Sequence, residues 1–428
     1  MRLGRKLALI AGVAVTATAA TAQQSGQKVT PPIAVYWMSA STQTGFGMPG
    51  MGGGGGRPDP QAMMRAMMGG GGANKTLQLQ LGSSQTNAEP HADHLPPEIL
   101  GAGPALPLLT PKAVPVVREE PEEYEVPREY QKPRGKMLIF WGCGERARPG
   151  QPVVIDFAKM AEGQIPQAMA AFKGIDFRPM RPPSPGRNKT YGEWPNERTR
   201  TAVPSEGSLV GGHTIRGNYN PEINFSLEED QDFLAPINLT TNEKAPAGHV
   251  NLGWNLVPNA QAYYATAIGG SGETMAMWTS SEVQAAAFAM PDYLSPSDLN
   301  RLVASKALMG PATKTCAVPK EFLDAAPQAL AQLAAYGGEA NFIYPPRPKD
   351  PKVTWNQQWA VKVRYRSATG GMLGQPMPGM MGGYEDDEDT PPRPGQRPPR
   401  QQQQPAKPPS AADILRKGIL GGALPIPR

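Results

Sequence analysis

Hydrophobic residues along this chain fall mainly in short runs that alternate with polar residues or are bounded by Gly and Pro. Leu77, Leu79 and Leu81 alternate with two glutamines, which is the period-two pattern of a strand with one buried face. The same reasoning predicts strands over the segments 33–38, 137–141, 153–157, 208–216, 221–227 and 358–366. Short strands with turn residues between them are typical of an antiparallel sandwich.

Helical patterns are few. The segment 296–308 predicts one helix, for which Ser295 is a suitable N-cap. The segment 325–336 predicts a second helix, ending at Gly337-Gly338. The expected fold class is therefore mostly β, with one or two antiparallel β-sandwich units, a few short helices and long disordered Gly/Met- and Pro-rich segments.

The predicted organisation has six parts. A signal peptide (1–22) precedes an N-terminal region (23–130), in which a strand pair flanks a Gly/Met-rich loop (43–74) and is followed by an extended connector. Two sandwich units follow (131–245 and 246–367), then a Gly/Met, acidic and Pro/Gln-rich linker (368–409) and a short C-terminal helix or tail (410–428). A single larger β-domain is the alternative to two units.

Glycine and proline, 48 and 49 residues, each have about twice their usual share. They concentrate in the segments 45–73 and 390–409, which lack the apolar content for a core and are expected to be disordered. The proline-rich segment favours an extended conformation, which suits a spacer or a docking ligand.

The first 22 residues have the three parts of a secretory signal peptide. Arg2, Arg5 and Lys6 form a positive start, an apolar run (7–15) follows, and Ala20-Thr21-Ala22 supplies small residues before Gln23. The apolar run is shorter than the ~20 residues of a spanning helix, and no later stretch is apolar enough to span. We predict cleavage after Ala22 and a periplasmic or secreted protein. An uncleaved N-terminal anchor is the alternative.

Charge limits the classes of partner to expect, and cysteine content indicates the pairing expected in an oxidising compartment. Without the signal peptide, 39 basic and 37 acidic residues remain, a net charge of +2 compared with +5 for the full chain. There is no basic stripe with interleaved aromatic residues, so nucleic acid is not an expected partner. The two cysteines, Cys143 and Cys316, are expected to form one disulfide in an oxidising compartment. Two buried free thiols are the alternative.

One segment suggests a family. A run of ten residues resembles the B-to-C strand region of fibronectin type III domains and, more generally, of immunoglobulin-like sandwiches. This run is Trp254-Asn255-Leu256-Val257-Pro258-Asn259-Ala260-Gln261-Ala262-Tyr263. The resemblance covers only the segment 249–267. It implies a core Trp on one strand, a proline-containing turn and a core Tyr on the next strand. It implies a fold and no ligand, and the helical stretches after Ser280 depart from a standard module of this family.

Methionine provides the main candidate chemistry. Met-Pro-Gly-Met occurs at 48–51 and 377–380, each time shortly after a strand that contains Tyr and Ser-Ala. Thioether sulfur is a soft ligand that selects Cu(I), which is the one cofactor these residues suggest. The alternative is that Met acts as a flexible apolar filler in low-complexity sequence. The candidate ligands are Met48, Met51, Met63, Met64, Met67, Met68, Met377, Met380 and Met381.

Histidine offers a weaker metal candidate. His91 and His94 have metal-like spacing, but the chain has only four histidines, and the other two, His213 and His249, lie in predicted strands. Because no third ligand is clustered nearby, polar residues in a surface loop are the better interpretation.

Three function hypotheses remain. Signatures such as Gly-x-Ser-x-Gly, His-Glu-x-x-His and a phosphate-binding loop are absent. The leading hypothesis is therefore a non-enzymatic binding or structural protein of the cell envelope, whose partner is a protein or another envelope component. The second is a periplasmic Cu(I)-binding protein. The third is an envelope enzyme with a site built from distant residues, for which Trp194, His213 and Asp230 are the first candidates.

Overall fold

The computed structural model describes residues 27–45, 73–111, 135–161, 180–199, 201–284 and 290–375. This part of the chain is mostly β-structure, which confirms the expected fold class. Its helices are short: α2 (Phe157–Ala161), α4 (Pro296–Ala304), α5 (Lys320–Ala325) and the 3-10 turns η1 (Glu98–Leu100) and η2 (Glu229–Gln231).

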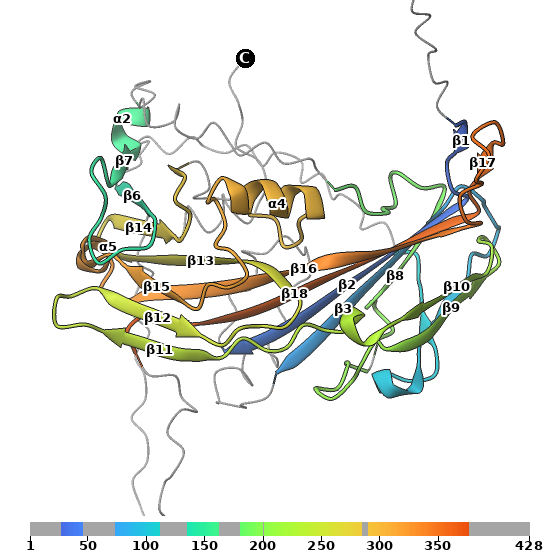
Figure 1. Ribbon diagram of the computed structural model, residues 1–428, viewed down its shortest axis with the longest axis horizontal. Coiled ribbons are helices and arrows are strands. Elements are labelled where there is room, and N and C mark those ends of the chain that lie inside the picture. The colour runs from blue at the N-terminus through green and yellow to red at the C-terminus, as the bar shows by residue number, and fades with distance from the viewer. Residues whose placement is uncertain are drawn as a thin grey trace, which may run out of the picture.

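One nine-stranded sheet organises the described residues (Figure 1), in the order β7-β6-β14-β13-β16-β18-β2-β3-β8. The sheet is mixed, because β6 pairs with β14 and β2 pairs with β18 in parallel, while the other neighbours are antiparallel. Its strands are β2 (Ala34–Gly45), β3 (Asn74–Ser83), β6 (Lys136–Trp141), β7 (Val153–Asp156), β8 (Thr190–Trp194), β13 (Ala260–Ser271), β14 (Thr274–Thr279), β16 (Ala329–Tyr344) and β18 (Trp359–Met372).

Three smaller sheets complete the β-structure. The first has four strands, β10 (Ile223–Leu227), β9 (Gly211–Gly217), β4 (Ala92–Leu95) and β5 (Leu106–Pro107). The second has three strands, β11 (Leu239–Lys244), β12 (Val250–Trp254) and β15 (Thr315–Val318). The third is a parallel pair, β1 (Val29–Thr30) and β17 (Trp355–Asn356).

Both faces of the large sheet carry apolar side chains, and each face is covered by other elements. On the inner face, residues such as Tyr36 of β2 share one core with Ile215 and Leu252 of the four- and three-stranded sheets. On the outer face, Tyr336 of β16 packs with Leu299 and other residues of α4. Since successive side chains of a strand point to opposite faces, the long strands contribute to both layers.

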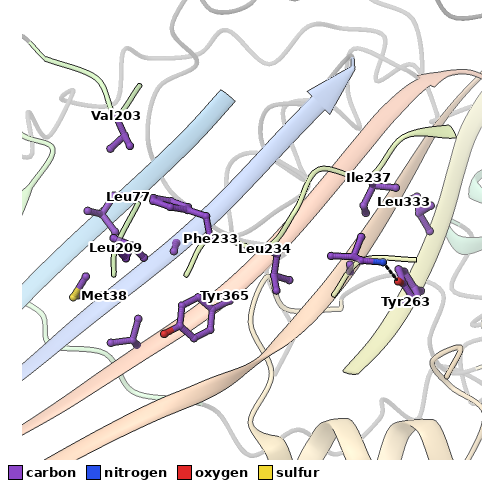
Figure 2. Packing of buried hydrophobic residues seen from close by; sticks show 14 of the residues in the cluster. Met38, Leu77, Val203, Leu209, Phe233, Leu234, Ile237, Tyr263, Leu333 and Tyr365 are labelled. Carbon is purple, nitrogen blue, oxygen red and sulfur yellow. Dashed lines mark hydrogen bonds between the residues drawn. The ribbon is translucent and has the colours of Figure 1, made fainter. Parts of the chain in front are cut away.

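The segment 232–238, between η2 and β11, also lies along the inner face (Figure 2). Phe233, Leu234 and Ile237 belong to the same buried core as Tyr263 of β13. The Tyr263 hydroxyl accepts a hydrogen bond from the backbone N–H of Val257, over 2.8 Å. An irregular segment thus contributes to this core alongside the regular strands.

A glycine bulge interrupts β16. The register with β18 shifts between Tyr336 and Glu339, across Gly337 and Gly338. A Cβ on Gly337 would lie 2.8 Å from the Cβ of Tyr365, so no larger residue fits without displacing the neighbouring strand. Bulges of this kind re-aim the side chains that follow them, and here the next side chain, that of Glu339, lies on the outer face.

The predicted helix over 325–336 is wrong. A short helix, α5, ends at Ala325, and the Ala-rich run from Ala329 to Tyr336 forms the first half of β16. This run lies between β13 and β18, pairs with both, and is apolar on both faces. Helix propensity is worth less than 1 kcal/mol per residue, so pairing on two sides outweighs it. The other predicted helix is confirmed as α4, capped by Ser295, although it ends at Ala304.

The large sheet takes strands from both predicted units, 131–245 and 246–367, and from the N-terminal strand pair. A boundary at 245/246 therefore does not separate two sheets. The predicted N-terminal strand pair is confirmed by the antiparallel pairing of β2 with β3. The signal peptide, most of the Gly/Met-rich loop, the linker after residue 375 and the C-terminal helix lie outside the described residues.

The expected disulfide joins Cys143 to Cys316. Cys143 follows β6 in the large sheet, and Cys316 lies in β15 of the three-stranded sheet. The backbone N–H of Gly144 also donates to the carbonyl of Ala317, over 2.9 Å. The bond therefore links the two layers through residues that lie 173 positions apart in the sequence.

Replacing both Cys143 and Cys316 with Ala should lower the free energy of unfolding by up to about 5 kcal/mol, because the unfolded chain regains the entropy of a loop closed over 173 residues. Urea unfolding measures this change. A reductant should lower the midpoint of the unmodified protein and leave the double variant unchanged. Equal midpoints for the two proteins in the absence of reductant would contradict the expectation.

Candidate functional site

The outer face of the large sheet carries a charged and aromatic cluster. Lys362, Arg364 and Arg366 occupy alternate positions of β18. The Arg364 guanidinium lies 4.9 Å from the ring centroid of Trp37 and 4.4 Å from that of Tyr293. Its Nε donates to the Ser39 hydroxyl over 2.7 Å. The planar cation is thus held between two rings, a favourable arrangement for guanidinium.

Two carboxylates pair with two of the three cations. Glu339 pairs with Lys362, and Asp292 accepts from Arg366 over 2.9 Å. The Glu339 side chain is only 3% exposed. Burial lowers the pKa of Arg364 and raises the pKa of Tyr293 to about 12, although the nearby arginines oppose the latter rise. Because Lys362 and Arg366 are paired, and Arg364 is held by two rings and Ser39, the cluster is best suited to fix the segment around Tyr293 onto the sheet.

A second polar network lies inside the inner-face core. Three side chains, Tyr36 of β2, His94 of β4 and His213 of β9, are fully or almost fully buried. The Tyr36 hydroxyl bonds to His94 Nδ1, and His94 Nε2 lies 2.9 Å from His213 Nδ1. His213 Nε2 lies 2.7 Å from the carbonyl oxygen of Leu209. The network joins the large sheet to the four-stranded sheet.

The end of the network determines the direction of every hydrogen bond. A carbonyl only accepts, so His213 Nε2 carries a proton and its Nδ1 accepts from His94 Nε2. His94 Nδ1 then accepts from the Tyr36 hydroxyl. Burial lowers the pKa of both histidines, and for His94 the neighbouring imidazole of His213 lowers it further. Both rings are therefore neutral and fully hydrogen-bonded, a state that stabilises the core and binds no metal.

This network separates the histidines that the sequence grouped together. His94 is buried against His213, whereas His91 is exposed just before β4. The described residues contain no cluster of three or more His, Cys, Asp or Glu that could hold a metal ion. The three residues suggested for a hidden active site also lie in different environments, because His213 is in the core, Trp194 is buried in β8 and Asp230 is exposed in η2.

The candidate Cu(I) ligands, from Met48 to Met68 and from Met377 to Met381, lie outside the described residues. The strands that lead into these two segments are described. Because β2 and β18 are parallel, Gly45 at the end of β2 pairs with Gly370 near the end of β18. Both Met-rich segments therefore begin at the same end of the sheet, on neighbouring strands. The sequence positions alone, more than 300 residues apart, do not indicate this.

The opposite end of β18 carries a surface that the sequence analysis missed. We define the tip surface as residues 27–30 and 343–356, which include β1, β17 and the end of β16. Figure 1 shows β1 and β17 together at one extremity of the long axis. Trp355 organises the surface, since its backbone N–H donates to the carbonyl of Lys28 and its ring Nε1 donates to that of Pro345, each over 2.8 Å.

The tip surface concentrates exposed apolar groups. Of the seven large hydrophobic side chains that are exposed among the described residues, four lie here. Their exposed fractions are 39–49%, and they are Val29, Ile343, Tyr344 and Val353. A clustered apolar patch on a protein surface indicates an interaction site more strongly than the same residues scattered singly.

Basic residues surround these apolar groups. Lys28, Arg347, Lys349 and Lys352 are all exposed, and Asp350 is the one acidic residue of the tip surface. The Arg347 guanidinium lies 5.7 Å from the ring centroid of Trp355 and donates to the side-chain carbonyl of Gln27 over 2.7 Å. The run Ile343-Tyr344-Pro345-Pro346-Arg347 was the available signal, but the pairing with Lys28 and Val29 is not visible in sequence.

Comparison of the chain with models of known protein families, with curated proteins and with solved structures finds no match in any of the three. The fibronectin type III resemblance at 249–267 therefore stays a prediction. Its Trp254 and Tyr263 lie in the core with ring centroids 5.7 Å apart. Within the described ranges, no helix has the length and hydrophobicity needed to cross a membrane.

The histidine network predicts acid sensitivity. The folded protein keeps His94 and His213 neutral because burial lowers the pKa of each below 6.5, whereas the unfolded chain takes up protons near pH 6.5. Stability should therefore be complete above about pH 6.5. Below it, stability should fall by up to about 1.4 kcal/mol per pH unit for each histidine.

Urea unfolding between pH 8 and pH 5 measures this slope. In the double variant His94→Gln/His213→Gln, stability should change less between pH 6.5 and pH 5 than in the unmodified protein. The exposed His91→Gln variant is the control and should keep the original slope. An unchanged slope in the double variant would show that these histidines are not the groups that titrate.

Proposed function

We propose that this chain is a non-enzymatic binding protein of the bacterial cell envelope, which engages an envelope component through the tip surface. The observation that carries the proposal is the clustering of four exposed hydrophobic side chains within a basic surround. The predicted signal peptide supports an extracytoplasmic location, and the disulfide suits an oxidising compartment.

The organisation of the other polar groups is consistent with this proposal. Burial lowers the pKa of both His94 and Arg364, and each of these residues is held in a hydrogen-bonded or stacked arrangement. Groups held in this way stabilise the scaffold. The tip surface, in contrast, presents apolar area to solvent, and removing such area from water is the main driving force of association.

The test is sedimentation of the chain 23–428 with isolated envelope fragments. Tyr344→Ser/Val353→Ser should weaken binding about tenfold or more, since burying each half-exposed side chain is worth roughly 1 kcal/mol. The matched control is Val154→Ser/Leu256→Ser, which removes two side chains of similar exposure (44% each) away from the tip. Equal loss in both variants, or none in either, would refute a role for the tip.

A second candidate function is Cu(I) binding by the Met-rich segments. Its support is the parallel register of β2 and β18, from which both copies of Met-Pro-Gly-Met follow at one end of the sheet. A Cu(I) site requires several soft sulfur ligands close together. Two short motifs that start on neighbouring strands can supply these ligands, whereas a single copy supplies only two.

We expect the chain 23–428 to bind Cu(I) at micromolar concentration in an anaerobic titration. If the two copies share one site, Met48→Leu/Met51→Leu should weaken binding as much as Met377→Leu/Met380→Leu. Leu keeps the size and apolar character of Met and removes the sulfur. No binding to the unmodified chain would exclude the proposal, and loss with only one pair would locate the site in one segment.

A further inference from the structure

We infer that the tip surface is a contact site for the anionic surface of a phospholipid bilayer. This inference rests on the proposed function and names its partner. Three features of the described residues support it: apolar side chains at the surface of a rigid framework, a surrounding excess of positive charge, and the point at which the chain enters the fold.

The apolar side chains are held on a framework that hydrogen bonds and a ring contact connect. Gln27 Nε2 donates to the carbonyl of Val353 over 2.9 Å, and the backbone N–H of Trp355 donates to that of Lys28 over 2.8 Å. The Tyr344 ring stacks on Trp359, with ring centroids 5.6 Å apart. The backbone N–H of Val353 donates to the carbonyl of Asp350 over 3.1 Å. Val353 can therefore enter the headgroup region without carrying unpaired backbone groups into it, which the bilayer strongly disfavours.

The aromatic residues suit the same location. Tyr and Trp are enriched at membrane–water interfaces, where an apolar ring and a polar group meet different surroundings. Tyr344 is 46% exposed. Trp355 is partly exposed, and its ring N–H is already bonded to Pro345.

The positive charge of the tip surface favours anionic lipids over neutral ones. Lys28, Lys349 and Lys352 are exposed and form none of the ion pairs found among the described residues. Asp350, the one acidic residue of the tip surface, accepts from the backbone N–H of Lys352 over 2.9 Å. With four basic side chains and one acidic side chain, the tip is complementary to a surface of anionic headgroups. Each basic residue near such a surface strengthens binding roughly fivefold.

The tip surface also lies close in sequence to the predicted signal peptide. The described chain begins at Gln27, within the tip surface, and the predicted signal-peptide run 7–15 lies eleven residues before it. Eleven residues extend at most about 40 Å. Before the predicted cleavage after Ala22, the tip surface is therefore the described part of the chain that lies nearest in sequence to the signal peptide.

The experiment measures binding of the chain 23–428 to vesicles of phosphatidylglycerol and phosphatidylcholine, and to vesicles of phosphatidylcholine alone. We expect binding to the anionic vesicles, and binding to the neutral vesicles at least tenfold weaker. Lys28→Gln/Lys349→Gln/Lys352→Gln should weaken binding to the anionic vesicles about a hundredfold, given roughly fivefold for each residue. Val29→Ser/Val353→Ser should weaken binding to both vesicle types.

The matched control replaces three exposed lysines away from the tip, Lys159→Gln/Lys244→Gln/Lys314→Gln, with the same change in net charge. This variant should bind the anionic vesicles within about threefold of the unmodified chain. Equal losses in the two triple variants would overturn the inference, because net charge alone would then explain binding. A urea unfolding curve for each variant identifies any loss that comes from misfolding.

Two results separate this inference from the function on which it rests. In the first, the chain does not bind anionic vesicles but still sediments with envelope fragments, and the tip substitutions weaken that sedimentation. In that case the partner is a protein or glycan and the lipid inference is wrong. If neither vesicles nor envelope fragments bind through the tip, both proposals are wrong.

Discussion

The ladder formed by β16, β18 and β2 is the constraint on which the rest of the structure depends. β18 pairs with β16 in an antiparallel register from Trp359 to Met372 and with β2 in a parallel register from Trp359 to Gly370. A central strand that is paired on both sides and apolar on both faces needs a covering layer above and below. The four-stranded and three-stranded sheets supply one layer, and α4 contributes to the other. The parallel pairing also brings the N-terminal strand beside the last strand of the described chain.

This ladder sets the positions of both candidate sites. At one end, Trp359 pairs with Ala34, and the chain continues into β1, β17 and the tip surface. At the other end, Gly370 pairs with Gly45, and the two Met-rich segments begin. A strand of fourteen residues spans about 45 Å. The two sites are therefore far apart on a common scaffold, so a substitution at one end is expected to leave the other unaffected.

The buried polar groups hold the covering layers in register. The Tyr36–His94–His213 network ties the four-stranded sheet to the inner face, and the disulfide ties the three-stranded sheet to the edge of the same sheet. On the outer face, Arg364 links the segment around Tyr293 to β2 through ring and hydroxyl contacts. Buried polar groups that are fully hydrogen-bonded favour one arrangement of layers over others, because any slip leaves a donor or acceptor unpaired.

The sequence by itself determined the local features of this protein. Alternation at Leu77, Leu79 and Leu81 identified a strand, Ser295 marked the start of α4, and two isolated cysteines predicted one disulfide, because each of these signals is carried by a few neighbouring residues or by composition. The tertiary structure alone decided the rest. It made the Ala-rich run after Ala329 a strand, placed His94 against His213, paired Val29 with Trp355 of β17, and set Gly45 beside Gly370. These outcomes depend on pairing between residues that lie 119 to more than 320 positions apart, or, for the Ala-rich run, on neighbours at both edges of one strand. The energies of this pairing exceed local secondary-structure propensity, and the residue pattern of a single segment does not indicate them.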